Sequence, residues 1–173
     1  MAAKKPVIGI CNGFQVLVRT GLLPLSRLGD MHATLTNNDS GHFECRWVEL
    51  MPVGNHCIFT KGMEGTTLNL PIAHGEGKFY ANTSVLEEIT QKNLVTLHYT
   101  ASDKPTQTYP HNPNGSLNAV AGICDSSGLI LGLMPHPERF VTPYQHPNWR
   151  RQKIDKPHGL AIFENAVNYA KNL

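Results

Sequence analysis

Cys11 is the residue best placed to do chemistry, and it stands within residues 7–15, VIGICNGFQ. An apolar run typical of a buried strand leads into it, and residues 14–22 have the pattern of a helix. A nucleophile on a sharp strand-to-helix turn needs small neighbours, and glycines stand two positions before and two positions after this cysteine. Because a helix start favours a thiolate, we expect a lowered pKa for Cys11. A buried cysteine in an ordinary turn is the alternative interpretation.

A second reactive group stands near the other end of the chain, in residues 134–139, MPHPER. His136 and Glu138 are two positions apart, so in extended backbone their side chains leave on the same side. The carboxylate can accept a hydrogen bond from one imidazole nitrogen and hold the other nitrogen toward a thiol. Taken alone, the pair also fits a histidine at a strand end, salt-bridged in a proline-rich turn. Together with Cys11, it forms the residue set of a cysteine enzyme of acyl transfer.

Length and composition limit the classes of protein that the chain can belong to. The 173 residues are 40% hydrophobic and 16% charged, which suits one well-packed domain over residues 1–173 and is too short for two. A formal net charge of +2 with scattered basic residues predicts no nucleic-acid surface, and the basic residues 150–153 are typical of a solvated loop. No run approaches the roughly 20 apolar residues of a membrane span, and the start lacks the apolar core of a signal peptide.

The cysteines and histidines indicate a reduced, cytoplasmic protein without a metal. The four cysteines have no regular spacing and form no Cys-x-x-Cys pair, so we expect free thiols. Cys45, Cys57 and Cys124 fall in expected strands and are interpreted as small core hydrophobes. The nine histidines show no metal-ligand spacing, and no glycine-rich phosphate loop is present.

The elements that must position the reactive residues alternate along the chain in the manner of an α/β domain. Residues 34–42 and 105–116 are expected as exposed or loop segments, and the glycines on either side of Glu76, just after His74, mark a turn or a close approach to a ligand. The patterns predict helices over 14–22, 84–91 and 159–171, strands over 43–50, 55–60 and 94–99, and a hairpin of strands 119–124 and 129–134.

Four separated motifs, GICNGFQ, PIAHGEGKF, NPNGS and MPHPER, carry a family resemblance. The chain resembles the glutaminase (class I glutamine amidotransferase) component of phosphoribosylformylglycinamidine synthase, over nearly its whole length from about Val7. The motifs that contain Cys11, His136 and Glu138 indicate only the class of glutamine amidotransferases. The motifs AHGEG and NPNGS indicate the phosphoribosylformylglycinamidine synthase component within that class. The resemblance implies a three-layer α/β fold, flavodoxin-like, with a mostly parallel sheet and helices on both faces.

The resemblance also implies roles for individual residues. Cys11 would attack the carboxamide of L-glutamine, His136 would move protons, and Glu138 would orient the imidazole; a γ-glutamyl thioester would form, lose ammonia and be hydrolysed to glutamate. His74 is expected to pack in its loop. The implied glutamine-binding residues are Asn12, through its backbone N–H, Gln15, Gly75 and Glu76. Loop-shaping or partner-facing roles are expected for Asn112, Asn114 and Ser116.

The implied partner is a synthetase subunit or domain that uses ATP and Mg²⁺ to convert formylglycinamide ribonucleotide to formylglycinamidine ribonucleotide in de novo purine synthesis. No cofactor is expected in this chain, and neither nucleic acid nor membrane is an expected partner.

The short segment before the cysteine departs from the family. Its members carry about 75 residues there, including the strand end that donates a second backbone N–H to the oxyanion. We therefore expect a chain truncated at its N-terminus, slower alone by about 10²- to 10³-fold and prone to associate through an exposed sheet edge. A catalytically impaired scaffold of the same complex and another cysteine hydrolase with the same turn are the alternative functions.

Overall fold

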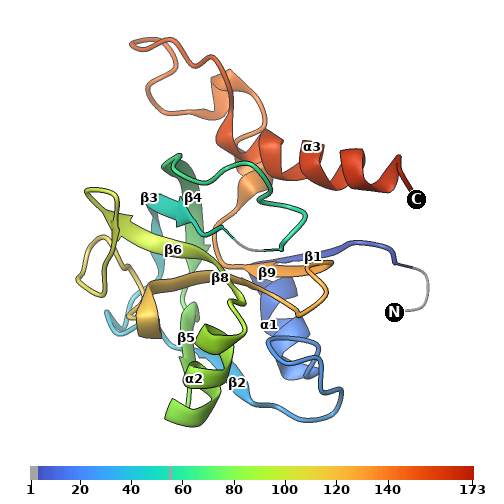
Figure 1. Cartoon of the computed structure of the whole chain (residues 1–173). Coiled ribbons are helices and arrows are strands. Elements are labelled where there is room, and N and C mark those ends of the chain that lie inside the picture. Colours follow the sequence, from blue (N-terminus) through green and yellow to red (C-terminus); the bar gives the residue numbers. More distant parts are fainter. Residues whose placement is uncertain (1–3, 55) are drawn as a thin grey trace.

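The computed structural model describes residues 4–54 and 56–173, which form a large mixed sheet, a small sheet and three α-helices (Figure 1). The helices are α1 (Asn12–Arg19), α2 (Thr83–Gln91) and α3 (His158–Ala170). The strands are β1 (Val7–Ile10), β2 (Ala33–Thr36), β3 (Glu44–Pro52), β4 (Leu68–His74), β5 (Lys78–Ala81), β6 (Val95–Ala101), β7 (Lys104–Pro105), β8 (Val120–Cys124) and β9 (Ile130–Leu133). Short 3₁₀ turns cover Leu117–Ala119, Pro137–Arg139 and Pro143–Gln145.

The large sheet has the order β1-β9-β8-β6-β3-β4, with β7 paired to β6, and β2 and β5 form the small sheet. The α/β class is confirmed, but the expected mostly parallel sheet is wrong. Among the described strands, β1 and β9 form the one parallel pair, and the other pairs are antiparallel. Short connections such as the turn between β8 and β9 reverse the chain, whereas a parallel pair needs a long crossover.

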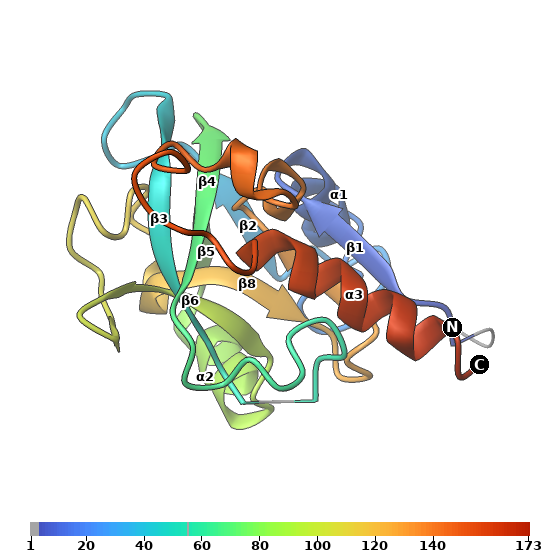
Figure 2. The same cartoon turned by 90° about the horizontal axis from the view of Figure 1, so that it is seen from above.

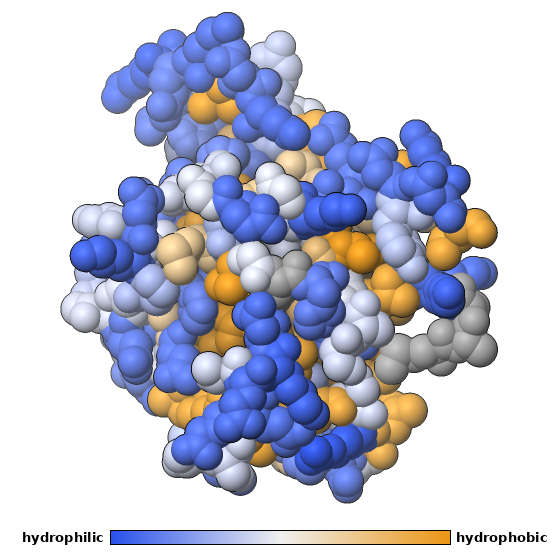
Figure 3. Space-filling view, viewed as in Figure 1, coloured by the Kyte–Doolittle hydropathy of each residue, from blue (hydrophilic) through white to orange (hydrophobic). Residues whose placement is uncertain are grey.

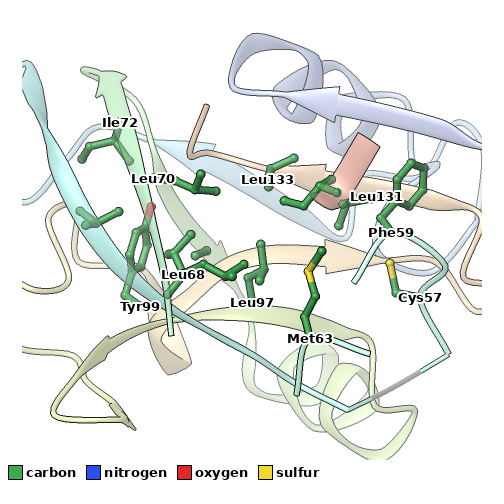
Figure 4. Packing of buried hydrophobic residues seen from close by; sticks show 14 of the residues in the cluster. Cys57, Phe59, Met63, Leu68, Leu70, Ile72, Leu97, Tyr99, Leu131 and Leu133 are labelled. Atoms are coloured by element: carbon green, nitrogen blue, oxygen red, sulfur yellow. The ribbon is translucent and has the colours of Figure 1, made fainter. Parts of the chain in front are cut away.

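Helices cover both faces of the sheet, as expected: α3 lies over one face, and α1 and α2 lie on the other (Figures 1 and 2). Successive residues of β9 supply the two cores. Ile130 packs with Phe14 of α1, whereas Leu131 and Leu133 belong to the core cluster that includes Ile162 of α3 (Figure 4). This alternation is the period of two that a strand imposes when both of its faces are buried.

Gly132 determines how closely α1 approaches β9. A Cβ at this position would lie 2.1 Å from Cδ2 of Phe14 and 2.7 Å from Cδ1 of Leu23. The absence of a side chain therefore lets the helix that follows Cys11 pack directly on the strand that leads toward His136.

Most predicted elements are present, with ends shifted by one or a few residues. The three helices, the strands near 43–50 and 94–99 and the 119–134 hairpin are confirmed. The strand expected over 55–60 is wrong in its described part, 56–60, which makes bends and turns, and Asn55 lies outside the described residues. Residues 34–42 are expected to form an exposed segment without a strand. This expectation is wrong at its start, where β2 forms because its residues pair with β5.

On the face that Figure 3 shows, the surface is mainly hydrophilic, and apolar patches lie between the hydrophilic residues. The segment 141–157 projects from the body of the molecule, and its basic residues 150–153 are exposed, as expected for a solvated loop. No helix in the described ranges is long and apolar enough to cross a membrane.

Strand β1 lies at the edge of the large sheet, with β9 on one side and no described strand on the other. Val7, Gly9 and Cys11 direct their backbone groups toward β9, so the alternation of a strand directs those of Ile8 and Ile10 outward. Association through this edge stays a prediction.

Candidate active site

Cys11 occupies a strained turn between β1 and α1. Its φ of 51° and ψ of −106° lie outside the regions that side-chain-bearing residues usually adopt. The backbone N–H of Cys11 donates to the carbonyl of Leu133 at 2.8 Å, which fixes the turn to the end of β9. Strain held in place by neighbouring structure is typical of a functional residue.

The two flanking glycines are not equivalent. A Cβ at Gly9 would lie 2.5 Å from Cδ1 of Leu17 and 2.7 Å from the backbone of Gly13, so this position requires glycine. At Gly13, an added Cβ would meet nothing within 4 Å. The expectation that small neighbours are needed is confirmed at the first position and wrong at the second.

The electrostatic surroundings of Cys11 differ from the expectation. Burial raises the pKa of the Cys11 thiol above its ordinary value and outweighs both the hydrogen bond from the Asn12 N–H and the attraction of Arg139, which lower it. The carboxylate of Glu138 adds to the increase. The expected lowering of the pKa is therefore wrong, and Cys11 needs a nearby base to become a thiolate at neutral pH.

His136 has the arrangement of such a base. Its Nδ1 lies 2.6 Å from Oε1 of Glu138, and a carboxylate can only accept, so Nδ1 carries a proton. In the neutral form of the ring, Nε2 is then the nitrogen with the lone pair. The ring is 7% exposed, and Nε2 has no hydrogen-bond partner among the described residues. A buried imidazole that a carboxylate orients, with its second nitrogen free of other partners, is what a proton acceptor requires.

The parallel pairing of β1 with β9 brings the two ends of the chain together. Ile10 pairs with Leu133, so Cys11 and His136 follow neighbouring parallel strands at their carboxyl ends. Both residues also contact β4: Sγ of Cys11 lies 3.9 Å from the carbonyl of Ala73, and the N–H of His136 donates to the carbonyl of Pro71 at 2.8 Å. Three strands therefore position the thiol and the imidazole.

The turn that follows β4 is held by Asn38, a residue that the sequence reasoning missed. Its side-chain amide donates to the carbonyls of His42 and His74, and its Oδ1 accepts from the N–H of Gly77 at 3.0 Å and from Nδ1 of His74 at 3.2 Å. Its own N–H donates to the carbonyl of Gly75. Asn38 is 3% exposed. It stands in a polar, turn-rich segment, where an asparagine alone carries no signal of this role.

His74 is a packed, uncharged histidine. Burial lowers its pKa to about 4, and its ring leaves no room for a side chain at position 77, where a Cβ would lie 2.4 Å from the ring. The expected packing role is supported by both observations. The glycine at 77 is therefore a consequence of the histidine at 74.

The NPNGS motif shapes the same turn from the other side. The side chains of Asn114 and Ser116 both donate to the carbonyl of Gly77, at 2.8 and 3.3 Å, and Asn112 accepts from the N–H of Ser116. The three side chains are at most 1% exposed. They are therefore loop-shaping, and the alternative of a partner-facing role is wrong.

A cavity of about 340 Å³ lies beside the Cys11 turn, and Asn12, Gln15 and Glu76 line it. The amide of Gln15 donates to the backbone carbonyl of Glu76 at 2.8 Å, which joins α1 to the turn after β4. Gly75 lines a different hollow, of about 470 Å³, together with Glu76 and His42. The structure thus groups three of the four implied glutamine-binding residues around one cavity and places Gly75 outside its lining. Neither Cys11 nor His136 is among the residues that line this cavity.

The other cysteines divide into two kinds. Cys57 and Cys124 are buried, as expected, although Cys57 lies outside any strand, whereas Cys45 is exposed. Cys45 follows the buried Glu44 in β3, and the alternation of a strand turns it outward, so the core interpretation of Cys45 is wrong. In the described part of the chain, no group of three or more histidine, cysteine or acidic side chains could hold a metal ion.

The family model of the CobB/CobQ-like glutamine amidotransferase domain matches residues 3–170. The chain belongs to this family. It is 46% identical over 170 residues to phosphoribosylformylglycinamidine synthase subunit PurQ of Dehalococcoides mccartyi, covering 96% of this chain and 64% of that protein. The subunit of the same name from Treponema denticola is 46% identical over 186 residues, which cover 98% of this chain and 68% of that protein. The resemblance read from the four motifs is confirmed.

Solved structures agree with this assignment. The structure of PurLQS from Thermotoga maritima matches with a TM-score of 0.71 and 32% identity, over 98% of this chain and 64% of that chain. The glutaminase domain of Trypanosoma brucei CTPS with bound acivicin has a TM-score of 0.51 at 17% identity, over 94% of this chain and 60% of that chain, and shows the same fold. The chain spans about two thirds of the length of the curated relatives it matches.

Replacing Asn38 by alanine should destabilise the turn after β4. It leaves the N–H of Gly77 and the carbonyl of His74 without their buried partner, a loss of about 1–3 kcal/mol in the free energy of unfolding. Urea unfolding followed by circular dichroism measures it. The exposed neighbour Asn37 is the matched control, and equal stability of the N38A and N37A variants would contradict the role of Asn38.

The low pKa of His74 predicts a loss of stability in acid. Since the folded pKa of about 4 lies below the ordinary 6.5, the unfolded chain binds more protons between these values, and stability falls as the pH drops through that window. The contribution of His74 is about 3 kcal/mol, from about 1.4 kcal/mol per pKa unit. Urea unfolding at pH 7 and pH 5 covers about 1.5 of these pKa units and should show a loss of about 2 kcal/mol, and the H74Q variant should lose less stability than the parent. An unchanged pH dependence in H74Q would refute the assignment.

Proposed function

We propose that the chain, acting as one domain, hydrolyses L-glutamine to glutamate and ammonia through a thioester on Cys11. The observation that carries the proposal is the joint placement of a strained cysteine and an oriented imidazole at the ends of β1 and β9. The names of the relatives, phosphoribosylformylglycinamidine synthase subunits, support the choice of reaction.

In the first step, Nε2 of His136 takes the proton of the Cys11 thiol, and the sulfur attacks the carboxamide carbon of glutamine. The raised pKa of Cys11 means that this transfer accompanies attack, because the thiol is otherwise protonated at neutral pH. Glu138 accepts the hydrogen bond from Nδ1 and stabilises the imidazolium that forms. The N–H of Asn12, which already points to the sulfur, donates to the oxyanion of the tetrahedral intermediate.

The remaining steps reverse the proton movement. The imidazolium of His136 gives its proton to the departing nitrogen, ammonia leaves, and the γ-glutamyl thioester remains on Cys11. Water then attacks the thioester, with His136 again as the base, and glutamate is released. Gln15 and Glu76 bind the amino-acid end of the substrate in the cavity of about 340 Å³, a volume that suits a small metabolite. Gly75 acts through the shape of the turn that carries Glu76.

The ammonia is useful only where an acceptor takes it up before it is protonated and lost. We assign the acceptor step to a synthetase partner that activates formylglycinamide ribonucleotide with ATP and Mg²⁺ and forms formylglycinamidine ribonucleotide. The similarity to the solved structure of PurLQS from Thermotoga maritima supports an assembly of this kind. The cytoplasm is the compartment that this proposal assigns.

Substitutions at the proposed triad should separate its roles. C11S should release no glutamate from glutamine, and E138Q should lower kcat by about 10²- to 10⁴-fold because the imidazole loses its orientation and charge partner. A coupled glutamate dehydrogenase assay measures both. The exposed Cys45 offers the matched control, so C45S should keep the parent rate.

Three results would count against the proposal. Glutamate release that survives C11S would remove the cysteine mechanism. A parent chain that binds the synthetase but releases no glutamate, alone or in the complex, would indicate a scaffold. Hydrolysis of peptides in preference to glutamine would indicate a different cysteine hydrolase.

A further inference from the structure

Two thiols outside the proposed active site, Cys57 and Cys124, belong to the core cluster on the α3 side. Figure 4 shows Cys57 in this cluster. The two thiols are hydrogen-bonded to each other. Sγ of Cys124 also lies 3.9 Å from Nε2 of His56, the residue next to Cys57 in the sequence. Cys11, in contrast, packs against the core cluster on the α1 side. The pair therefore forms a separate chemical group that the glutaminase mechanism does not use.

The backbone around the pair holds the two sulfurs close together. The N–H of Ile58 donates to the carbonyl of Gly128 at 3.1 Å, and Nε2 of His56 lies 3.0 Å from the carbonyl of Asp125. Gly128 allows this contact, since a Cβ there would lie 2.2 Å from the carbonyl oxygen of His56. The segment that carries Cys57 is thus fixed against the turn that follows Cys124.

The two thiols differ in reactivity. The hydrogen bond with Cys124, with those from Phe59 and Thr60, lowers the pKa of Cys57 to about 7, although burial opposes it. The same hydrogen bond and burial both raise the pKa of Cys124. Cys57 is therefore the more acidic thiol of the pair, which suits an attacking cysteine beside a resolving one.

A route for a small reagent exists beside Cys57. A cavity of about 920 Å³ is lined by His56, Cys57 and Ile58 on one side and by residues of α3, such as Asn165 and Tyr169, on the other. This volume exceeds what a peroxide molecule needs. Cys57 is 1% exposed, so only a small reagent can reach its sulfur from this cavity.

We propose that Cys57 and Cys124 form an oxidation site, a dithiol that hydrogen peroxide converts to an intramolecular disulfide. The Cys57 thiolate attacks one peroxide oxygen, the O–O bond breaks, and the departing hydroxide takes a proton to leave as water. The sulfur of Cys124 then attacks the sulfenic acid sulfur of Cys57, and the hydroxyl group leaves with the Cys124 proton as a second water. The two sulfurs lose two electrons, and one peroxide is reduced; a thiol reductant reverses the change.

The disulfide would join the connection between β3 and β4 to the end of β8. Since β8 pairs with β9, the cross-link would constrain the unfolded chain around the strand that leads to His136. We therefore expect a higher midpoint of thermal unfolding after oxidation.

A variant with C11S and C45S tests the proposal, because only Cys57 and Cys124 remain. After peroxide treatment, its intact mass should fall by two hydrogen atoms, and the thiols counted after denaturation should fall from two to none and return with dithiothreitol. Added C124A should stop the reaction at a sulfenic acid, one oxygen heavier, and added C57A should react more slowly. Unchanged thiols, oxygen addition without a cross-link, or a disulfide between two chains would each overturn the proposal.

The parent chain provides a readout that does not depend on how the variants fold. Peptide mapping without reductant, after peroxide treatment of the native protein, should find the peptides of Cys57 and Cys124 joined to each other. Joined peptides that contain Cys45 or Cys11 in their place would reject the pairing.

Discussion

The account depends on one backbone hydrogen bond, from the N–H of Cys11 to the carbonyl of Leu133. This bond closes the parallel ladder between β1 and β9, and it fixes how far each strand extends before its reactive residue follows. Cys11 comes directly after one strand and His136 comes three residues after the other. A shift of the ladder by one residue would turn the side chains of β1 to the opposite face. Packing of Phe14 on Gly132 holds this register from the α1 side.

The ionisable groups of the proposed site, Cys11 and His136, each have surroundings that affect their acid–base chemistry. Burial raises the pKa of Cys11, so in the proposed mechanism its reactivity depends on His136, whose Nδ1 proton is held by Glu138. The turn after β4 supplies the other wall of the site, and it is built almost entirely from buried hydrogen bonds. Asn38 and Asn114 approach Gly77 from two distant segments, so the AHGEG and NPNGS motifs are parts of a single structure.

The sequence predicts best where the signal is local. The Gly9-x-Cys11 turn, the HPE stretch and the apolar 119–134 hairpin each carry their own pattern, whereas the family followed from the four motifs together. His136 and Glu138 do pair, but the extended backbone expected there is wrong, because Pro137–Arg139 forms a 3₁₀ turn. The prediction failed where tertiary context decides. Burial reversed the expected pKa shift of Cys11, and strand alternation exposed Cys45. Pairing with β5 made β2 out of a turn-rich segment, and the role of Asn38 depends on partners 36 and 39 residues away.

The central claim is that His136 and Glu138 activate Cys11 toward the carboxamide of glutamine. The most direct measurement is covalent labelling of the native chain with a glutamine-analogue electrophile, followed by mass spectrometry of the intact chain and its peptides. The account predicts one adduct, on Cys11, which excess L-glutamine prevents and which forms far more slowly in an H136N variant. An adduct that forms equally on the exposed Cys45, or labelling of Cys11 that neither glutamine nor the loss of His136 alters, would contradict it.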